Sequence, residues 1–397
     1  MSDSFRINYK DYPEFMFAMI ASFLPDKEGN DIRKCAGQII YRHNKINKDN
    51  CTYCYKNGTL HSFENEPAVT HKCGKKEWYK DGNLHRDDDQ PSIIYNNKNR
   101  QEWYKNGVLH RESDLPAVVS DNRQEWYTNG KRHRDGDLPS IILSNGTNKW
   151  YKHGKRHRDG DLPAIISSYG SNKWYKNGVL HRNNDLPAII DGERMEWRKD
   201  GMRHRENDKP AIIDGERTEW WFNGKLARDN DQPVIIFGEI MYWIVDNIRH
   251  RGGDKPAIIH GQRMEWWRSG KLHRDQGPAL IDHNREEWWN CGNLHRSSEN
   301  DEPALIIEDI KEWYSYGQLH RDGDLPAHIC KDRQEWYKEG LLHRDHDLPA
   351  SIFNGGEILI WYKNGLLHRD GGLPAYIDED KILFYIEGEC KNIFELT

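Results

Sequence analysis

The stretch WYKNGVLHRESDLPAVV, which runs from Trp103 to Val119, decides the fold because versions of it recur along most of this chain. A later copy, WYKNGLLHRDGGLPAYI, begins at Trp361. The fifth residue of each copy is a glycine, and most successive glycines are 23 to 25 residues apart, with one spacing of 22. They are Gly58, Gly82, Gly107, Gly130, Gly154, Gly178, Gly201, Gly224, Gly270, Gly292, Gly317, Gly340 and Gly365, with Asn247 replacing one glycine and a degenerate copy at Gly388. This period predicts an array of small units that pack on their neighbours.

The composition supports the same interpretation. Only 36% of the 397 residues are hydrophobic, although 16 are tryptophan, so a thin aromatic core in an elongated array is favoured over a globular core. The net charge of −6 and the lack of a basic block argue against nucleic-acid binding. Seven irregularly placed cysteines indicate a reducing compartment. With no recognisable signal peptide, these features predict a soluble, cytoplasmic protein.

Each glycine lies in a predicted β-hairpin. Asn106-Gly107 is a type I′ turn sequence, since both central residues of that turn need positive φ. A two-residue loop fixes the cross-strand pairs as Tyr104 with Leu109, Trp103 with His110, and Glu102 with Arg111. Alternation then places Trp103 and His110 on one face and the other four side chains on the opposite face.

The segment 116–119 is expected to add a third short strand, starting at Pro116, so that each unit is a meander of two or three strands. The predicted fold is an all-β repeat array, an elongated meander of stacked antiparallel β-hairpins. About 14 units occupy residues 49–380, with a short helical N-terminal cap at 1–48 and a C-terminal capping hairpin at 381–397.

The units resemble MORN repeats (membrane occupation and recognition nexus), which have an aromatic residue three places before a Gly and a His three places after it. Tyr151, Gly154 and His157 follow this pattern. Arg158 stands where the family has a second Gly, and a Leu-Pro-Ala phrase follows, so the chain is similar to divergent arrays of large DNA viruses of protists. That resemblance covers residues 51 to about 390 and implies a host-cell or virion location and, from the family name, lipid binding. The acidic net charge disfavours lipid binding.

The repeated polar residues have two interpretations. The His-Arg pair, His110 and Arg111 in this copy, could bind metal, but equivalent histidines are expected too far apart to share an ion. Asp114, two places before Pro116, resembles a calcium-loop residue, but one regular acid per unit is too few ligands. We therefore predict structural roles: histidine packed on Trp103, and aspartate paired with an arginine of its own or the next unit.

The tryptophan column is predicted to form the core, although stacking on bases or sugars is the alternative. The position after each tryptophan varies more, which marks a surface for a partner. The partner-binding candidates are Arg198, Trp221, Trp267 and Trp289.

A zinc site is the alternative for Cys51, Cys54, His71 and Cys73, because these four residue types are zinc ligands. Cys54 stands at a tryptophan position, however, so a degenerate first repeat explains the same residues. No cofactor or metal is predicted. No catalytic motif occurs, and repetition spreads like residues along a line, whereas catalysis needs unlike residues at one place.

Residues 12–25 read as a helix between two prolines and resemble the start of an F-box, with a second helix expected from about 31 to 41. An F-box would recruit a Skp-type adaptor of a ubiquitin ligase through residues 1–48, whereas a simple capping helix would only cover the first repeat. The favoured function is a non-enzymatic repeat scaffold that binds other proteins along an extended β-surface. The alternatives are an F-box-type substrate receptor and a lipid-associated MORN protein.

Overall fold

The structure is a computed structural model that describes residues 46–48, 50–96 and 99–396. It forms two compact units: the first extends to Gly192 and includes 197–201, and the second comprises 193–196 and the chain from Met202. Apart from the 3-10 residue Asn96, the helical elements in the described part of the chain are the short 3-10 turns η2 (Ser298–Asn300), η3 (Asn354–Gly356) and η4 (Asp370–Gly372). None of them is long enough to cross a bilayer. The predicted N-terminal helices, with their F-box-like segment, lie outside the described residues.

The all-β array of stacked antiparallel hairpins is confirmed, but each repeat has four strand segments where two or three were predicted. In one repeat these are β11 (Tyr104–Lys105), β12 (Val108–Leu109), β13 (Val118–Ser120) and β14 (Arg123–Glu125). β11 and β12 form a separate two-stranded hairpin, while β13 and β14 belong to a long antiparallel sheet. The extra segment arises because the chain leaves the long sheet at each tryptophan before it enters the next hairpin.

The predicted turn is confirmed, but the predicted register holds only within the hairpin. Glu102 pairs with Ile93 and Val118 of the long sheet and not with Arg111, because the chain leaves the long sheet at Trp103. Tyr104 pairs with Leu109, and Asn106 and Gly107 have φ of 50° and 83°. The turn also forms where glycine is missing, because Asn247 adopts a φ of 62°. Asparagine tolerates this left-handed conformation better than most residues, so the repeat survives the substitution.

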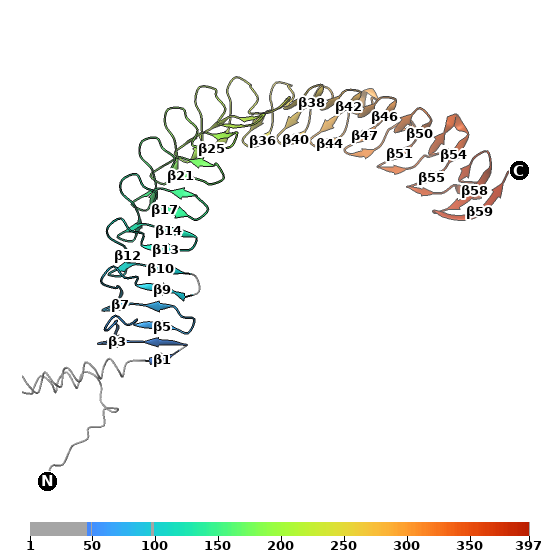
Figure 1. The fold of residues 1–397 in the computed structure, drawn as a ribbon. Coiled ribbons are helices and arrows are strands. Elements are labelled where there is room, and N and C mark those ends of the chain that lie inside the picture. Colours follow the sequence, from blue (N-terminus) through green and yellow to red (C-terminus); the bar gives the residue numbers. More distant parts are fainter. Residues whose placement is uncertain (1–45, 49, 97–98, 397) are drawn as a thin grey trace, which may run out of the picture. The chain divides into compact units, whose positions relative to one another are not determined.

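In the first unit, successive repeats lie side by side in chain order (Figure 1). Its long sheet contains, besides β13 and β14, the strands β1 (Ile46–Lys48), β2 (Cys51–Tyr53), β5 (Val69–His71), β6 (Lys76–Glu77), β9 (Ile93–Tyr95), β10 (Arg100–Glu102), β17 (Ile141–Leu143), β18 (Asn148–Lys149), β21 (Ile165–Ile166), β22 (Asn172–Lys173) and β25 (Ile189–Asp191). Its hairpin strands, besides β11 and β12, are β3 (Tyr55–Lys56), β4 (Thr59–Leu60), β7 (Tyr79–Lys80), β8 (Asn83–Leu84), β15 (Tyr127–Thr128), β16 (Lys131–Arg132), β19 (Tyr151–Lys152), β20 (Lys155–Arg156), β23 (Tyr175–Lys176), β24 (Val179–Leu180) and β27 (Arg198–Lys199).

The second unit continues the same pattern. Its long sheet contains β26 (Arg194–Glu196), β29 (Ile212–Asp214), β30 (Arg217–Glu219), β33 (Ile235–Phe237), β34 (Ile240–Tyr242), β37 (Ile258–His260), β38 (Arg263–Glu265), β41 (Leu280–Asp282), β42 (Arg285–Glu287), β45 (Leu305–Ile307), β46 (Ile310–Glu312), β49 (His328–Cys330), β50 (Arg333–Glu335), β53 (Ser351–Phe353), β54 (Ile358–Ile360), β57 (Tyr376–Ile377), β58 (Lys381–Ile386) and β59 (Glu389–Glu395). Its hairpin strands are β28 (Met202–Arg203), β31 (Trp221–Phe222), β32 (Lys225–Leu226), β35 (Ile244–Val245), β36 (Ile248–Arg249), β39 (Trp267–Arg268), β40 (Lys271–Leu272), β43 (Trp289–Asn290), β44 (Asn293–Leu294), β47 (Tyr314–Ser315), β48 (Gln318–Leu319), β51 (Tyr337–Lys338), β52 (Leu341–Leu342), β55 (Tyr362–Lys363) and β56 (Leu366–Leu367). The last two sheet strands, β58 and β59, pair with each other around a turn at Gly388.

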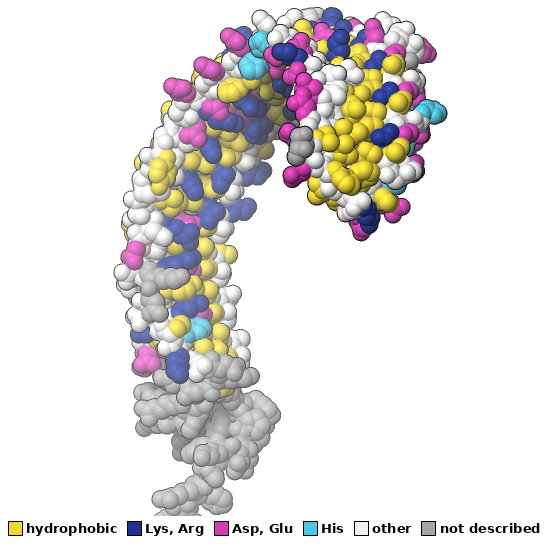
Figure 2. All heavy atoms as spheres, turned by 90° about the vertical axis from the view of Figure 1, so that its right-hand side faces the viewer, with side chains coloured by type: hydrophobic (Ala, Val, Ile, Leu, Met, Phe, Trp, Pro, Cys, Tyr) yellow, Lys and Arg dark blue, Asp and Glu magenta, His cyan; other side chains and the backbone are white. Residues whose placement is uncertain are grey.

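The core is a thin layer of tryptophan and alanine. Trp103 is buried and its backbone N–H donates to the carbonyl of Ala117, whose side chain is fully buried. Small residues predominate at this position: Ser140 takes the place of alanine beside Trp126, and Val234 takes it beside Trp220. Hydrophobic and basic side chains lie together over the face displayed in Figure 2. The tryptophan column therefore forms the core, as predicted.

Candidate functional site

Each repeat contributes to two rows of interacting side chains. The clamp row consists of the tryptophan, the arginine that follows each His position, and the aspartate two places before the proline. The acid row consists of the residue before each tryptophan and the aliphatic residues that pair with it in the long sheet. The two rows differ in what they leave available to a partner.

The clamp row ties each repeat to the one before it. The guanidinium carbon of Arg111 lies 3.8 Å from the centre of the Trp103 ring. Its Nε and Nη2 each donate to Asp89 of the preceding repeat at 2.8 Å, and the indole N–H of Trp103 donates to the Asp89 carbonyl at 3.0 Å. The pairs with this geometry are Arg111–Asp89, Arg134–Asp114, Arg158–Asp137, Arg182–Asp161, Arg228–Asp208, Arg251–Asp231, Arg274–Asp254, Arg321–Asp301, Arg344–Asp324 and Arg369–Asp347.

Two expectations about this row now have an outcome. Asp114 pairs with Arg134 of the next repeat, as predicted, and the hydrogen bonds from Arg134 hold the pKa of Asp114 below its ordinary value. The face predicted for Arg111 is wrong. Arg111 stacks on Trp103 and donates to the carbonyl of Pro116 because it lies beyond the end of β12, where strand alternation no longer applies.

The histidines link repeats as well. Nδ1 of His85 accepts the backbone N–H of Asn106 in the next repeat, at 3.1 Å, and Nε2 lies 2.9 Å from Asp87. His110 forms the same link to the N–H of Asn129. Nε2 of His85 thus bonds within its own repeat, whereas Nδ1 reaches the neighbouring hairpin. Both ring nitrogens of His85 are thus used within the fold.

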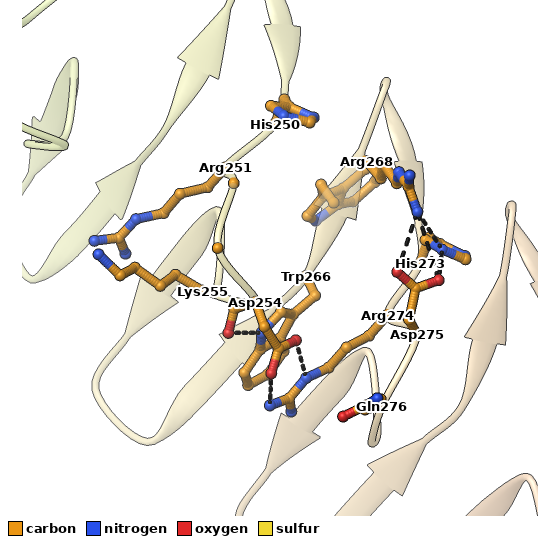
Figure 3. A pocket seen from close by; sticks show the side chains of 13 residues that line it. His250, Arg251, Asp254, Lys255, Trp266, Arg268, His273, Arg274, Asp275 and Gln276 are labelled. Carbon is orange, nitrogen blue, oxygen red and sulfur yellow. Dashed lines mark hydrogen bonds and ion pairs between the residues drawn. The ribbon is translucent and has the colours of Figure 1, made fainter.

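A hollow of about 460 Å³ lies beside the clamp row between two repeats of the second unit (Figure 3). Its rim includes His250, where Gly252 replaces the acid that follows most histidines by two places. The four lysine and arginine side chains that line it all donate to carboxylates. They form the pairs Arg251–Asp231, Lys255–Asp231, Arg268–Asp275 and Arg274–Asp254. The hollow therefore has little spare positive charge for an anionic ligand.

The acid row was not recognised in the sequence. Glu102 pairs with Val118, which in turn pairs with Glu125, so carboxylates and aliphatic side chains alternate across the sheet. Glu102 and Glu125 are only 3% and 2% exposed. The available signal was the glutamate that precedes most tryptophans: Glu77, Glu102 and Glu125 in the first unit, and Glu196, Glu219, Glu265, Glu287, Glu312 and Glu335 in the second.

These buried carboxylates are compensated by their neighbours. Glu125 accepts from Nε of Arg123, Nε of Arg132 and the hydroxyl of Tyr127, at 3.0, 3.1 and 2.8 Å. Burial, together with the hydrogen bond to Glu125, raises the pKa of Tyr127 to about 12. A buried carboxylate is tolerated only with such partners, so the acid row fixes the tyrosine column that lies over it.

The partner-binding candidates lie in this aromatic column. The indole N–H groups of Trp221, Trp267 and Trp289 donate to the glutamates two places earlier, at 2.7, 2.8 and 2.6 Å. All three residues are half-buried, so part of each surface faces solvent. Arg198 occupies the same column and donates to the carbonyl of Gly201 at 2.6 Å. The column is thus a set of partly exposed side chains held in fixed positions.

The zinc candidates are only partly brought together. Sγ of Cys51 lies 3.1 Å from Nδ1 of His71, whose Nε2 contacts Glu77. Cys54 is buried at the tryptophan position of the first repeat, with its N–H bonded to the Ala68 carbonyl, and Cys73 is exposed. Among the described residues no group of three or more His, Cys, Asp or Glu side chains could hold a metal ion.

Comparison of the chain with models of known protein families and with curated proteins gives no match in either case.

Proposed function

We propose that the chain is a non-enzymatic scaffold that binds other proteins along its repeat surface. The observation that carries this proposal is the aromatic column of Trp221, Trp267 and Trp289, which is half-buried, rigidly held and repeated. Tryptophan is enriched among the residues that dominate protein interfaces. A side chain already fixed by a hydrogen bond loses little entropy when a partner covers it.

The distribution of polar groups also favours binding over catalysis. Arginines of the clamp row are paired with aspartates, and glutamates of the acid row with arginine, tyrosine or tryptophan. Like residues recur at repeat spacing, which suits a partner that contacts several repeats through weak, additive contacts. The resemblance to MORN repeats is consistent with a scaffold but rests on sequence alone.

The test is proximity labelling with the full chain and with a variant carrying Trp221→Tyr, Trp267→Tyr and Trp289→Tyr. Tyrosine occupies this column in other repeats and donates there to the same glutamate, as Tyr337 does to Glu335, so the fold should be kept. Partners that contact the indoles should be lost from the labelled set. Val245→Ala, an exposed change on a neighbouring hairpin, is the matched control. An identical labelled set for all three proteins would refute the proposal.

A further inference from the structure

The acid row changes its charge in two adjacent repeats of the first unit. Lys149 and Lys173 stand before Trp150 and Trp174, where the other repeats of this unit with a tryptophan have glutamate. Lys149 pairs with Ile165, and Ile165 pairs with Lys173, so the two lysines lie in one row with a single aliphatic residue between them. Two strand spacings separate them, which is roughly 10 Å.

Neither lysine has a carboxylate partner within the described residues, and both are half-buried. Arg156 likewise has no carboxylate partner in the part of the chain that the structure describes. Its Nε donates to the hydroxyl of Tyr151 at 3.0 Å, and its Nη1 donates to that of Tyr175 at 3.3 Å. In the neighbouring repeat, by contrast, Arg132 donates to Glu125. The segment thus keeps three cations whose charge the fold does not neutralise.

A polar atom beside the lysines also lacks a partner. Ser171 lies two places before Lys173, just before β22, and its hydroxyl oxygen is buried without a hydrogen bond. A buried hydroxyl without a partner costs free energy. Because this oxygen is buried, a ligand at the surface would contact the two ammonium groups rather than the hydroxyl.

We infer that Lys149, Lys173 and Arg156 form a docking site for an extended acidic segment of a partner protein, an inference that rests on the proposed scaffold function. Side chains two residues apart lie on one face of an extended chain, about 7 Å from each other, so two carboxylates of such a segment can reach both flexible lysine side chains. Ile165, which is half-buried between the two lysines, is available to an apolar side chain of the same segment, whereas Ile141 is buried. Charge complementarity of this kind sets specificity and association rate.

The same residues fit a nucleic acid poorly. Tyr151 and Tyr175 stack with Arg156, whose guanidinium carbon lies 5.9 and 5.3 Å from their ring centres, so these rings are not free platforms for bases. Three cations are also few for a phosphate backbone, whose affinity depends on many such contacts. An acidic peptide needs fewer charges and uses the aliphatic row.

The experiment measures binding of a fluorescent peptide of alternating Glu and Thr to the full chain, with a Gln-Thr peptide for comparison. The test variant is Lys149→Glu with Lys173→Glu, which introduces the residue found in the other tryptophan-containing repeats of this unit and should therefore fold. The matched control is Lys152→Glu with Lys176→Glu, which makes the same change of charge on exposed hairpin residues of the same two repeats. Circular dichroism and thermal unfolding check that both variants are folded.

The expected result is that the Glu-Thr peptide binds, that the test variant weakens binding by about tenfold or more, and that the control changes it by roughly twofold or less. Absence of binding to the unmodified chain, or equal weakening by both variants, would overturn the inference. Tighter binding of a single-stranded oligonucleotide of equal charge, lost in the same variant, would also overturn it. If the peptide fails while partner labelling still depends on the tryptophan column, only this inference fails and the scaffold function stands.

Discussion

Replacing Arg134 with alanine removes one complete clamp between two repeats of the first unit. The guanidinium lies 3.9 Å from the centre of the Trp126 ring, and this contact contributes about 1–2 kcal/mol because the arginine side chain is only 13% exposed. The bidentate pair with Asp114, which is half exposed, adds about 1 kcal/mol after solvent screening. The long hydrogen bond to the Pro139 carbonyl adds little. We therefore expect a local loss of about 2–3 kcal/mol.

Native-state hydrogen exchange is the suitable assay, because repeat arrays open locally and one global unfolding free energy does not describe them. The N–H of Gly130, which bonds to the Leu109 carbonyl of the preceding repeat, should lose protection, whereas that of Gly340 in the second unit should not. Asp114→Ala should cost less than Arg134→Ala, since it leaves the stacking intact. Unchanged protection at Gly130 in the arginine variant would refute the clamp as an energetic link between repeats.

Two further predictions concern the clamp row and the acid row, and a third concerns the turn glycines. Hydrogen bonds from arginine lower the pKa of Asp114, Asp137 and Asp324 below 3.8, so the contribution of these pairs to stability is present above pH 3.8 and is lost as the pH falls through the lower folded-state values. A thermal midpoint that stays constant from pH 5 to pH 3 would contradict this. Glu125→Gln should destabilise the chain by about 2–3 kcal/mol, because two arginines lose a buried anion, and should move the pKa of Tyr127 down from about 12 in an ultraviolet titration. Gly270→Ala should cost about 1 kcal/mol more than Gly58→Ala in denaturant titrations. Both glycines have positive φ, but only at Gly270 would the new Cβ meet another side chain, that of Ile248, at 2.9 Å. Equal costs would show that the Ile248 side chain moves aside.

How far the sequence predicts the fold depends on how local the interaction is. The period and the Asn106-Gly107 turn predict stacked hairpins and the pairing of Tyr104 with Leu109, because turn geometry and register follow from adjacent residues. The pairing of Asp114 with a repeat arginine was also predicted, but whether that arginine belongs to the same or the next unit was left open, and the structure shows the next. The predicted N-terminal helices and their F-box resemblance stay predictions, since they lie outside the described residues.

Only the tertiary structure decides what happens beyond the end of each short strand and between strands from different repeats. Arg111 leaves the alternation of β12 and stacks on Trp103, and a fourth strand segment appears because the chain leaves the long sheet at the tryptophan. Glu102 and Glu125 alternate with an aliphatic residue, and the charge of this row reverses at Lys149. Both features depend on which strand of one repeat pairs with which strand of the next. A sequence read one repeat at a time contains the residues of such a row but not their neighbours, because those neighbours are set by packing between repeats.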